Sequence, residues 1–189
     1  TTTHIVSPVV EMGKGNLDSA EFRESCRRIG VELGVKGRVW RRAFAEALRV
    51  QRHFEECCRE SGRAALEFCA AQGLVPVVVL GRAYTIYNRV LNSNVPAILR
   101  EQGAVAIPID CYPVTEAPVF PDLYWGYGQR IMGAAHQIRR ATGVYSLYCS
   151  NYSCGPDSFL LHFYSYIMEG KPFAVIAPDG HSGDAGTKT

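Results

Sequence analysis

Short apolar runs alternate with helical patterns in the part of the chain that follows residue 74. The runs show no polar alternation, which is typical of parallel strands that helices cover on both faces. Because crossovers between parallel strands are right-handed, a flavodoxin-like strand order is the simplest topology. The pattern therefore predicts an α/β fold, a small doubly wound parallel sheet of about four strands with helices on both faces. The predicted strands span 75–80, 104–110, 143–150 and 172–178.

The part of the chain before residue 74 has a helical pattern instead. One helix can begin at a cap formed by Asp18 or Ser19. A longer helical pattern covers about 38–72, and Gly62 is expected to divide it. These helices precede the predicted sheet and contain no motif with chemistry of its own.

An apolar stripe runs along the longer helical pattern, where Trp40, Phe44 and further residues recur at steps of four and three. We therefore expect residues 1–73 to form an N-terminal helical arm that packs on the sheet of residues 74–189, so that both make one compact domain. The chain lacks an initiator Met and ends in GDAGTKT. We expect it to be a fragment of a longer protein.

The composition argues against several classes of protein. The 189 residues are 47% hydrophobic and carry a formal net charge of +2 without a sustained basic stripe, so we expect no nucleic-acid partner. No apolar run approaches the roughly 18 residues of a membrane helix, and no charged-then-apolar leader is present, so we expect no membrane contact and a cytoplasmic location. The chain contains no Walker-type phosphate loop, so ATP is expected only on other modules.

The seven cysteines are odd in number and irregularly spaced in a chain long enough for a full core, which argues against a secreted disulfide scaffold. Most of them, including Cys149 in an apolar run, are expected to act as small hydrophobes. Cys111 follows the second predicted strand and is either an incidental thiol or one that oxidises with Cys154. The cysteines in helical patterns are Cys26, Cys57, Cys58 and Cys69.

In a parallel sheet, the loops that leave the carboxyl ends of the strands meet at one edge, beside the N-termini of helices. Four segments of this chain follow predicted strands in this way, and every unusual local sequence falls within them. This edge is therefore the predicted functional site. The segments are 81–92, 110–113, 151–157 and 179–184.

Cys154 lies between an apolar run and a helical pattern, and Gly155 and Pro156 follow it directly. Proline suits the first turn of a helix and glycine permits tight geometry before it, so Cys154 is predicted at or just before a helix N-terminus. The helix dipole and free N–H groups there favour a thiolate, which attacks electrophiles or binds metal. The alternative is an ordinary turn cysteine beside a cap formed by Ser153 or Asp157.

The residues alone leave the chemistry of this thiol open. A cysteine nucleophile needs a histidine base, and His181 on the following loop is best placed to serve as one. An iron–sulfur cluster is usually held by about four thiolates, and the chain has no clustered set of that kind. A cluster bound by this segment alone is therefore not expected.

Several stretches of the second part form a specific combination, namely VVVLGRAYTIYN with Leu91-Asn92, AVAIPID, LYWGYGQRIMGAA, SNYSCGPDSFLLHFY, MEGKPF and HSGDAG. Through them, the chain from about residue 75 to residue 185 resembles the activase-related proteins of the 2-hydroxyacyl-CoA dehydratase system. Those anaerobic proteins join ATPase activator modules to a region that is similar to the dehydratase subunits and the double-cubane-cluster reductases.

The resemblance implies that this chain is the second of two α/β lobes whose cysteines together hold an iron–sulfur cluster, of the 4Fe–4S kind, that passes low-potential electrons. It implies that Cys154 is a ligand and that the other ligands lie outside this fragment. We expect no catalytic residue in the fragment itself. The expected environment of the cluster or substrate comprises Gly81, Arg82, Tyr84, Asn88, Asn92, Asn151, Ser153, Gly155, Asp157, Ser158, His181 and Asp184.

Three functions from different classes remain open. The first is a cluster-binding electron-transfer lobe of an ATP-coupled reductase or dehydratase activase, which is inactive without its other lobe. The second is an acyl-CoA or nucleotide-binding domain without a cluster. The third is a scaffold that docks the ATPase activator through the helical arm. The expected partners are the activator module, on the same or a separate chain, together with an acyl-CoA substrate and a second copy of the chain.

Overall fold

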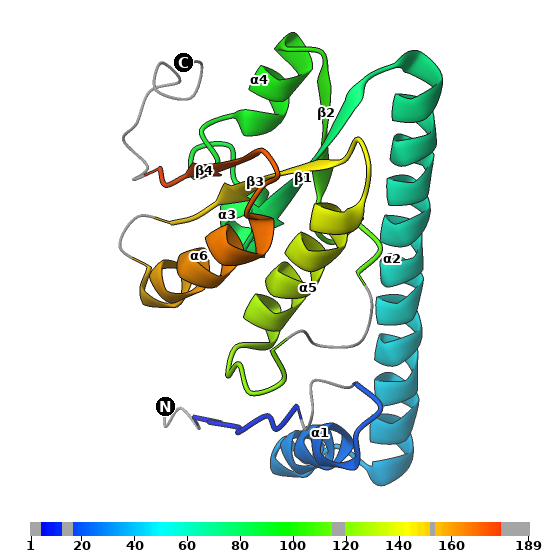
Figure 1. The fold of residues 1–189 in the computed structure, drawn as a ribbon. Coiled ribbons are helices and arrows are strands. Elements are labelled where there is room, and N and C mark those ends of the chain that lie inside the picture. The colour runs from blue at the N-terminus through cyan, green and yellow to red at the C-terminus, as the bar shows by residue number, and fades with distance from the viewer. Residues whose placement is uncertain (1–4, 13–16, 115–119, 152–153, 179–189) are drawn as a thin grey trace. The chain divides into compact units, whose positions relative to one another are not determined.

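The computed structural model describes residues 5–12, 17–114, 120–151 and 154–178. The chain divides into two compact units, residues 1–56 and residues 57–189. Helix α2 (Gly37–Gln72) begins in the first unit and ends in the second. Figure 1 shows the elements of both units in chain order. No helix within the described ranges is both long enough and apolar enough to cross a membrane.

Aromatic side chains of α1 (Ala20–Glu32) and of the N-terminal part of α2 hold the first unit together. Ser19 starts α1, because its hydroxyl accepts a hydrogen bond from the amide of Phe22 at 3.1 Å. The ring of Phe44 lies 5.3 Å from that of Trp40 and 5.9 Å from that of Phe22. The indole of Trp40 also donates a hydrogen bond to a backbone carbonyl of α1 at 2.8 Å. Trp40 and Phe44 of the predicted stripe therefore contact α1 within this unit.

Helix α2 continues without a break through Gly62, so the predicted division of the helix at this residue is wrong. A glycine inside a helix costs only about 1 kcal/mol relative to alanine, which the helix-forming residues on either side outweigh. The reason for the glycine lies in packing, because a Cβ atom placed on it would lie 1.7 Å from the carbonyl oxygen of Cys111. Gly62 is buried and allows the helix to touch the loop that follows β2.

A sheet of four parallel strands in the order β2-β1-β3-β4 forms the centre of the second unit. This is the flavodoxin-like order, and with the helical segment that precedes it the predicted fold class is confirmed. The central strand β1 is apolar, and all of its residues after the first are buried. The strands are β1 (Val75–Gly81), β2 (Ala104–Pro108), β3 (Tyr145–Cys149) and β4 (Phe173–Ile176).

Helices cover both faces of this sheet. In Figure 1, α5 and α6 lie side by side on one face, whereas α4 lies on the other face and contacts β2. The core contains Leu80 and Tyr148 from the strands and Ile131 and Tyr164 from the helices, each at most 1% exposed. The helices are α3 (Ala83–Ile86), α4 (Val95–Glu101), α5 (Gly126–Arg140) and α6 (Gly155–Met168).

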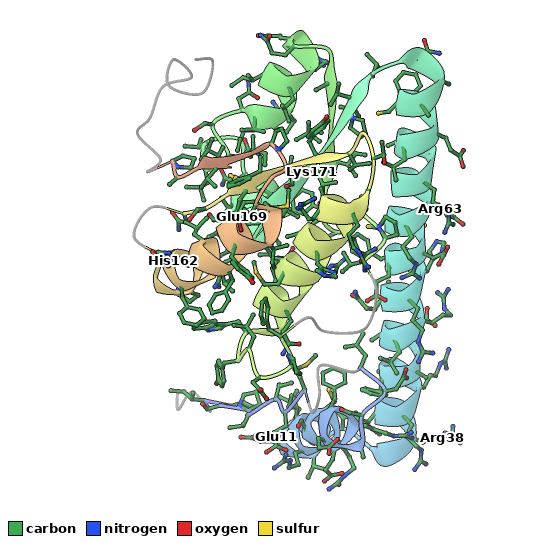
Figure 2. The ribbon with its side chains drawn as sticks, viewed as in Figure 1. Glu11, Arg38, Arg63, His162, Glu169 and Lys171 are labelled. Carbon is green, nitrogen blue, oxygen red and sulfur yellow. The ribbon has the colours of Figure 1, made fainter. Side chains whose placement is uncertain are left out.

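The turn between α6 and β4 completes the C-terminal end of α5. Gly170 has a φ of 78°, in the left-handed region that glycine adopts without strain. The next residue, Lys171, donates hydrogen bonds from its ammonium group to the carbonyl oxygens of Ile138 and Ala141. The Ile138 carbonyl also accepts a hydrogen bond from the amide of Ala141 at 3.1 Å. Ala141 is the C-cap residue of α5, so no further amide of the helix reaches its own carbonyl. Lys171, labelled in Figure 2, therefore ties α5 to the start of β4.

Candidate functional site

The carboxyl ends of the four parallel strands share one edge of the sheet, and the loops and helix starts after them contain the predicted site residues. Gly81 and Arg82 end and follow β1, Cys111 follows β2, and Cys154 follows β3. The structure thus brings these segments to the predicted edge. Three predicted site residues lie outside the described residues, namely Ser153, His181 and Asp184.

Gly81 ends β1 with a φ of 149°, a backbone conformation that favours glycine. A Cβ atom on it would lie 2.4 Å from the carbonyl oxygen of Cys149 and 2.8 Å from a methyl carbon of Ile86. Cys149 is its partner in the register between β1 and β3. Gly81 therefore permits the close approach of two strand ends at the predicted site.

Cys154 is the N-cap residue of α6, as the Gly-Pro sequence after it predicts. Its carbonyl oxygen accepts hydrogen bonds from the amide and the hydroxyl of Ser158, both at 2.9 Å. Its amide donates to the carbonyl oxygen of Asn151 at 3.0 Å. The thiol makes no capping hydrogen bond and is partly exposed, and the neighbouring Gly155 adds no side chain. The sulfur is therefore available to an external ligand.

Asp157 anchors the loop beside Cys154. Its carboxylate is fully buried and accepts hydrogen bonds from Nε of Arg82 at 3.2 Å and from the hydroxyl of Tyr148 at 3.3 Å. The backbone amide of Asn151 donates to it at 3.3 Å. The side chain of Arg82 is 25% exposed, so it balances the buried charge while its outer part reaches solvent. This ion pair fastens the start of α6 to the end of β1.

The groups of this cluster also change one another's protonation. Burial and the carboxylate of Asp157 raise the pKa of Tyr148 well above its ordinary range, so the phenol stays a donor. Burial lowers the pKa of Arg82, but the hydrogen bond and charge of Asp157 outweigh this effect and raise it, with a smaller contribution from Cys154. Sequence reasoning missed Tyr148 because a tyrosine within an apolar strand gives no sign of a polar contact.

The other predicted residues of the loop after β1 differ in their surroundings. Asn88 accepts hydrogen bonds from the backbone amides two and three residues further on, at 3.0 and 3.2 Å, and so forms a local turn. Asn92 is 3% exposed and donates from Nδ2 to the carbonyl oxygen of Ile86 at 2.7 Å. Its side-chain oxygen is buried and has no hydrogen-bond partner among the described residues. Tyr84 is 49% exposed and open to a partner.

A second polar cluster surrounds Asp110, just after β2. Its carboxylate accepts hydrogen bonds from the hydroxyls of Tyr87 at 3.0 Å and Tyr127 at 3.4 Å, and a guanidinium nitrogen of Arg130 lies 3.3 Å away. Burial and the Asp110 charge raise the pKa of Tyr127 to about 12, so this phenol also remains a donor. Asp110 and Tyr87 lie in the predicted site segments 110–113 and 81–92, but they are not among the individually expected residues, and Tyr127 and Arg130 lie outside those segments. An aspartate directly after an apolar strand is the signal that identifies it.

Thiols of the same edge are not equivalent. Cys149 is buried, and burial followed by the charge of Asp157 raises its pKa to about 12, in agreement with the small hydrophobe that we predicted. Cys111 shares a hydrogen bond with the thiol of Cys58 rather than with Cys154. Among the residues that the structure describes, no three histidine, cysteine or acidic side chains are grouped so that they could hold a metal ion.

An apolar cavity of about 390 Å³ lies beside the first turns of α6. The ring of Phe159 lies 5.8 Å from that of Trp125 and 5.0 Å from that of Phe163, so aromatic faces form much of the wall. Phe159 lies in the second turn of α6, and Cys154 is not among the residues that line the cavity. Its other lining residues are Phe120, Asp122, Leu123, Tyr124 and Met132.

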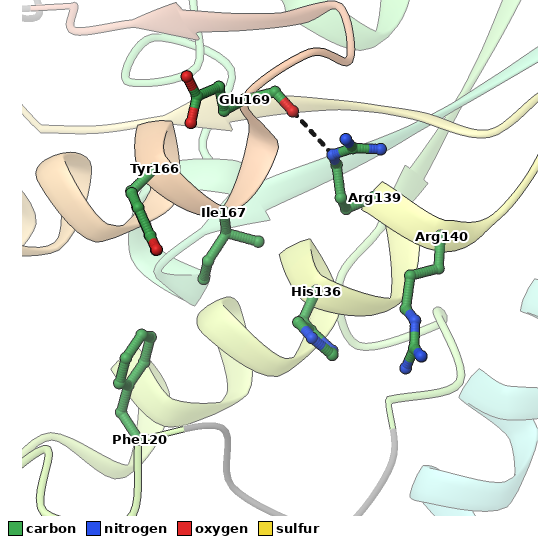
Figure 3. A pocket seen from close by; sticks show the side chains of 7 residues that line it. All are labelled: Phe120, His136, Arg139, Arg140, Tyr166, Ile167 and Glu169. Atoms are coloured by element: carbon green, nitrogen blue, oxygen red, sulfur yellow. Dashed lines mark hydrogen bonds between the residues drawn. The ribbon is translucent and has the colours of Figure 1, made fainter.

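A wider cavity of about 680 Å³ lies toward the C-terminal ends of α5 and α6 (Figure 3). Its lining includes His136, Arg139 and Arg140 from α5, and Tyr166 and Glu169 near the end of α6. Arg139 donates a hydrogen bond to the carbonyl oxygen of Glu169 at 2.8 Å. Helices that connect parallel strands run opposite to them, so this cavity faces away from the edge that carries the predicted site. It contains no predicted site residue.

The comparison with protein families agrees with the resemblance in the sequence. Residues 1–112 match the family described as CoA enzyme activase uncharacterised domain (DUF2229), and because the match covers more than half of the chain, the chain belongs to this family. The matched part includes Gly81, Arg82 and Cys111, whereas Cys154 lies beyond it. No curated protein and no solved structure matches the chain.

Proposed function

We propose that this chain is the second α/β lobe of an iron–sulfur protein in ATP-coupled, low-potential electron transfer of the 2-hydroxyacyl-CoA dehydratase and activase type. Cys154 is one ligand of the cluster, and the other thiolates come from a segment outside these residues. The observation that carries the proposal is the partly exposed thiol of Cys154, which starts α6 without a capping role. Membership of the CoA enzyme activase family supports it.

The donor set fits one ligand of a shared cluster. A cluster usually takes about four thiolates, and the other thiols near this edge have different roles. Cys149 is buried, and Cys111 is engaged by Cys58. A complete cluster at Cys154 therefore needs thiolates that the described residues do not supply, which agrees with a site between two lobes.

The surroundings of Cys154 favour negative charge. The helix that it starts has 14 residues, and the free amides and dipole of its first turn stabilise an anion. The guanidinium of Arg82 interacts favourably with the Cys154 charge and is held in position by Asp157. Hydrogen-bond donors and positive charge near cluster sulfurs stabilise their negative charge. When bound, the cluster supplies one-electron transfer at low potential.

ATP hydrolysis belongs, in this proposal, to an activator module on the same or a separate chain. The helical arm is the docking surface that the third hypothesis requires. Trp40 and Phe44, however, contact each other and Phe22 of α1. We therefore assign no activator contact to this stripe, and changing it to polar residues should unfold the first unit before it affects docking.

Anaerobic reconstitution with iron and sulfide tests the cluster proposal. We expect residues 1–189 alone to bind a cluster weakly, and a longer polypeptide that contains the lobe with the other cysteines to bind it firmly. The variant Cys154→Ser should lose the cluster in both cases. Chemical determination of iron and labile sulfide, together with the visible absorbance of the cluster, gives the result.

Cys111→Ser is the matched control, because Cys111 follows the neighbouring strand but is engaged by Cys58. It should retain the iron and sulfide content of the unchanged protein. Full iron content in Cys154→Ser, or an equal loss in both variants, would show that Cys154 is not a ligand.

A second candidate function is the binding of an acyl-CoA without a cluster, and the aromatic cavity beside α6 favours it. A cavity of about 390 Å³ can receive an acyl group, since ligand pockets are mainly apolar with few polar groups. Titration calorimetry with CoA thioesters of increasing acyl length tests this. Saturable binding that survives Cys154→Ser and is weakened by Phe159→Ser would favour this function, and absence of saturable binding would exclude it.

A further inference from the structure

Two thiols from distant segments meet in the second unit. Cys58 lies on α2, Cys111 lies in the loop after β2, and their side chains share a hydrogen bond. Both are free thiols, and neither is part of the proposed cluster site. A contact between two reduced cysteines that are far apart in the chain is the arrangement from which a disulfide can form.

The backbone holds these segments together independently of the thiols. Gly62 lies one helical turn after Cys58 and thus on the same side of α2. A Cβ atom placed on Gly62 would lie only 1.7 Å from the carbonyl oxygen of Cys111. The helix therefore touches the backbone of the residue that carries the second thiol, and the two sulfurs cannot separate far unless the helix leaves the loop.

Both thiols can be reached from solvent, and the surroundings of Cys111 disfavour its thiolate. Cys58 and Cys111 are each partly exposed, whereas Cys69 of the same helix is buried. Burial, followed by the charge of Cys58 and the hydrogen bond to it, raises the pKa of Cys111 to about 11. Cys111 is therefore protonated at neutral pH, so the first attack on an oxidant is assigned to Cys58.

We propose that Cys58 and Cys111 form a redox-active dithiol that closes to an intramolecular disulfide, with a small-molecule disulfide as the oxidant. The Cys58 thiolate attacks one sulfur of the oxidant, and the S–S bond breaks to release one small thiol. Cys111 then gives its proton to solvent and attacks the Cys58 sulfur of the mixed disulfide, releasing the second small thiol as a thiolate that takes up a proton. The protein loses two electrons and two protons, and the oxidant gains both.

The disulfide joins α2 to the end of β2 and changes how firmly this edge is held. The loop that it closes contains all of β1 together with Gly81 and Arg82 of the predicted site. A long closed loop stabilises the folded state because it removes conformational entropy from the unfolded chain. The oxidised protein should therefore have a higher thermal midpoint than the reduced protein.

The experiment treats the reduced protein with oxidised glutathione under nitrogen, blocks the remaining thiols with iodoacetamide, and identifies linked peptides by mass spectrometry. We expect a peptide pair joined through Cys58 and Cys111 that dithiothreitol separates, and a rise in the thermal midpoint. Cys58→Ser and Cys111→Ser should each abolish both effects. Cys57→Ser, which changes the adjacent residue of the helix, is the matched control and should preserve both.

Several outcomes would overturn the proposal. One is a peptide pair in which a disulfide links Cys111 to Cys154 or to Cys57. The others are mixed disulfides with glutathione without any linked peptide pair, and a linked peptide pair that still forms in Cys58→Ser. Circular dichroism of each variant before oxidation separates loss of the disulfide from loss of the fold. Cys58→Ala provides a second variant, because alanine favours a helix. The test contains no iron, so its result is independent of the cluster proposal.

Discussion

Replacing Gly62 by alanine sets helix propensity against packing. In an isolated helix, this change stabilises by up to about 1 kcal/mol, because alanine loses less backbone entropy than glycine. In this protein, the added methyl group would lie 1.7 Å from the carbonyl oxygen of Cys111, where real Cβ contacts are essentially never closer than 3.0 Å. The helix and the loop must therefore move apart by at least 1.3 Å, the difference between these two distances.

The magnitude follows from the kind of atom that the methyl group meets. A backbone carbonyl cannot rotate away as a side chain can, so relief requires a shift of α2 relative to the loop after β2. Overpacking of this kind costs about 1–3 kcal/mol and sometimes more. Because the clash is with backbone atoms, the cost lies at the upper end of this range. After the gain of up to about 1 kcal/mol in propensity is subtracted, we expect Gly62→Ala to lower the free energy of unfolding by about 2 kcal/mol.

Urea unfolding of the reduced protein measures this difference. Gly126→Ala is the matched control, because Gly126 also lies in a helix of the second unit and a Cβ atom on it meets nothing within 4 Å. The control should be neutral or slightly more stable than the unchanged protein. If Gly62→Ala were as stable as the control, the contact between α2 and the loop would not be as close as described, and the geometry behind the dithiol would fail with it.

Three further changes have expected outcomes. Asp157→Asn should lower the free energy of unfolding in urea by about 3 kcal/mol, because it leaves Arg82 without its buried partner. Glu46→Gln, which breaks an exposed ion pair, should leave this free energy essentially unchanged, and equal effects of the two changes would contradict this reasoning. The free energy of unfolding of the reduced protein should fall as pH rises from about 9 to about 11, because burial raises the pKa of Cys111 from 9.0 to about 11 and its thiol therefore ionises first in the unfolded chain. In Cys111→Ala, the part of the pH dependence that comes from this thiol should be absent. Lys171→Met should lower the free energy of unfolding in urea by about 1 kcal/mol, because the carbonyl of Ala141 loses its ammonium donor while that of Ile138 keeps the amide of Ala141. No change in stability would show that water replaces the ammonium.

The strands could be predicted because each is a short apolar run, and burial on both faces leaves the same pattern in any parallel sheet. The predicted strand 143–150 is β3 over Tyr145–Cys149, and the predicted strand 172–178 is β4 over Phe173–Ile176. The predictions are too long because the sequence pattern continues beyond the residues that the strand register includes. The order of the strands was chosen as the simplest one that right-handed crossovers allow, and handedness alone does not fix it, because it is a general property of chains rather than of particular residues.

Local signals in the candidate site could also be predicted, whereas contacts between distant segments could not. The position of Cys154 at a helix start follows from the two residues after it, and Ser19 as a cap follows from the helix beside it. The pair of Arg82 and Asp157 and the meeting of two thiols depend on how strands and helices pack, which no local pattern encodes. Gly62 was misinterpreted for the same reason, since the contact that explains it lies far away in the chain.

The hydrogen bonds that Lys171 donates to the end of α5 affect the order in which contacts can form during synthesis. Lys171 follows Ala141 by 30 positions, so the ribosome has already made β3 and α6 when this lysine is added. Until Lys171 has left the exit tunnel, the final turn of α5 lacks the contact with its ammonium group and frays in water. The C-terminal end of α5 can therefore gain this contact only after β3 and α6 have been synthesised.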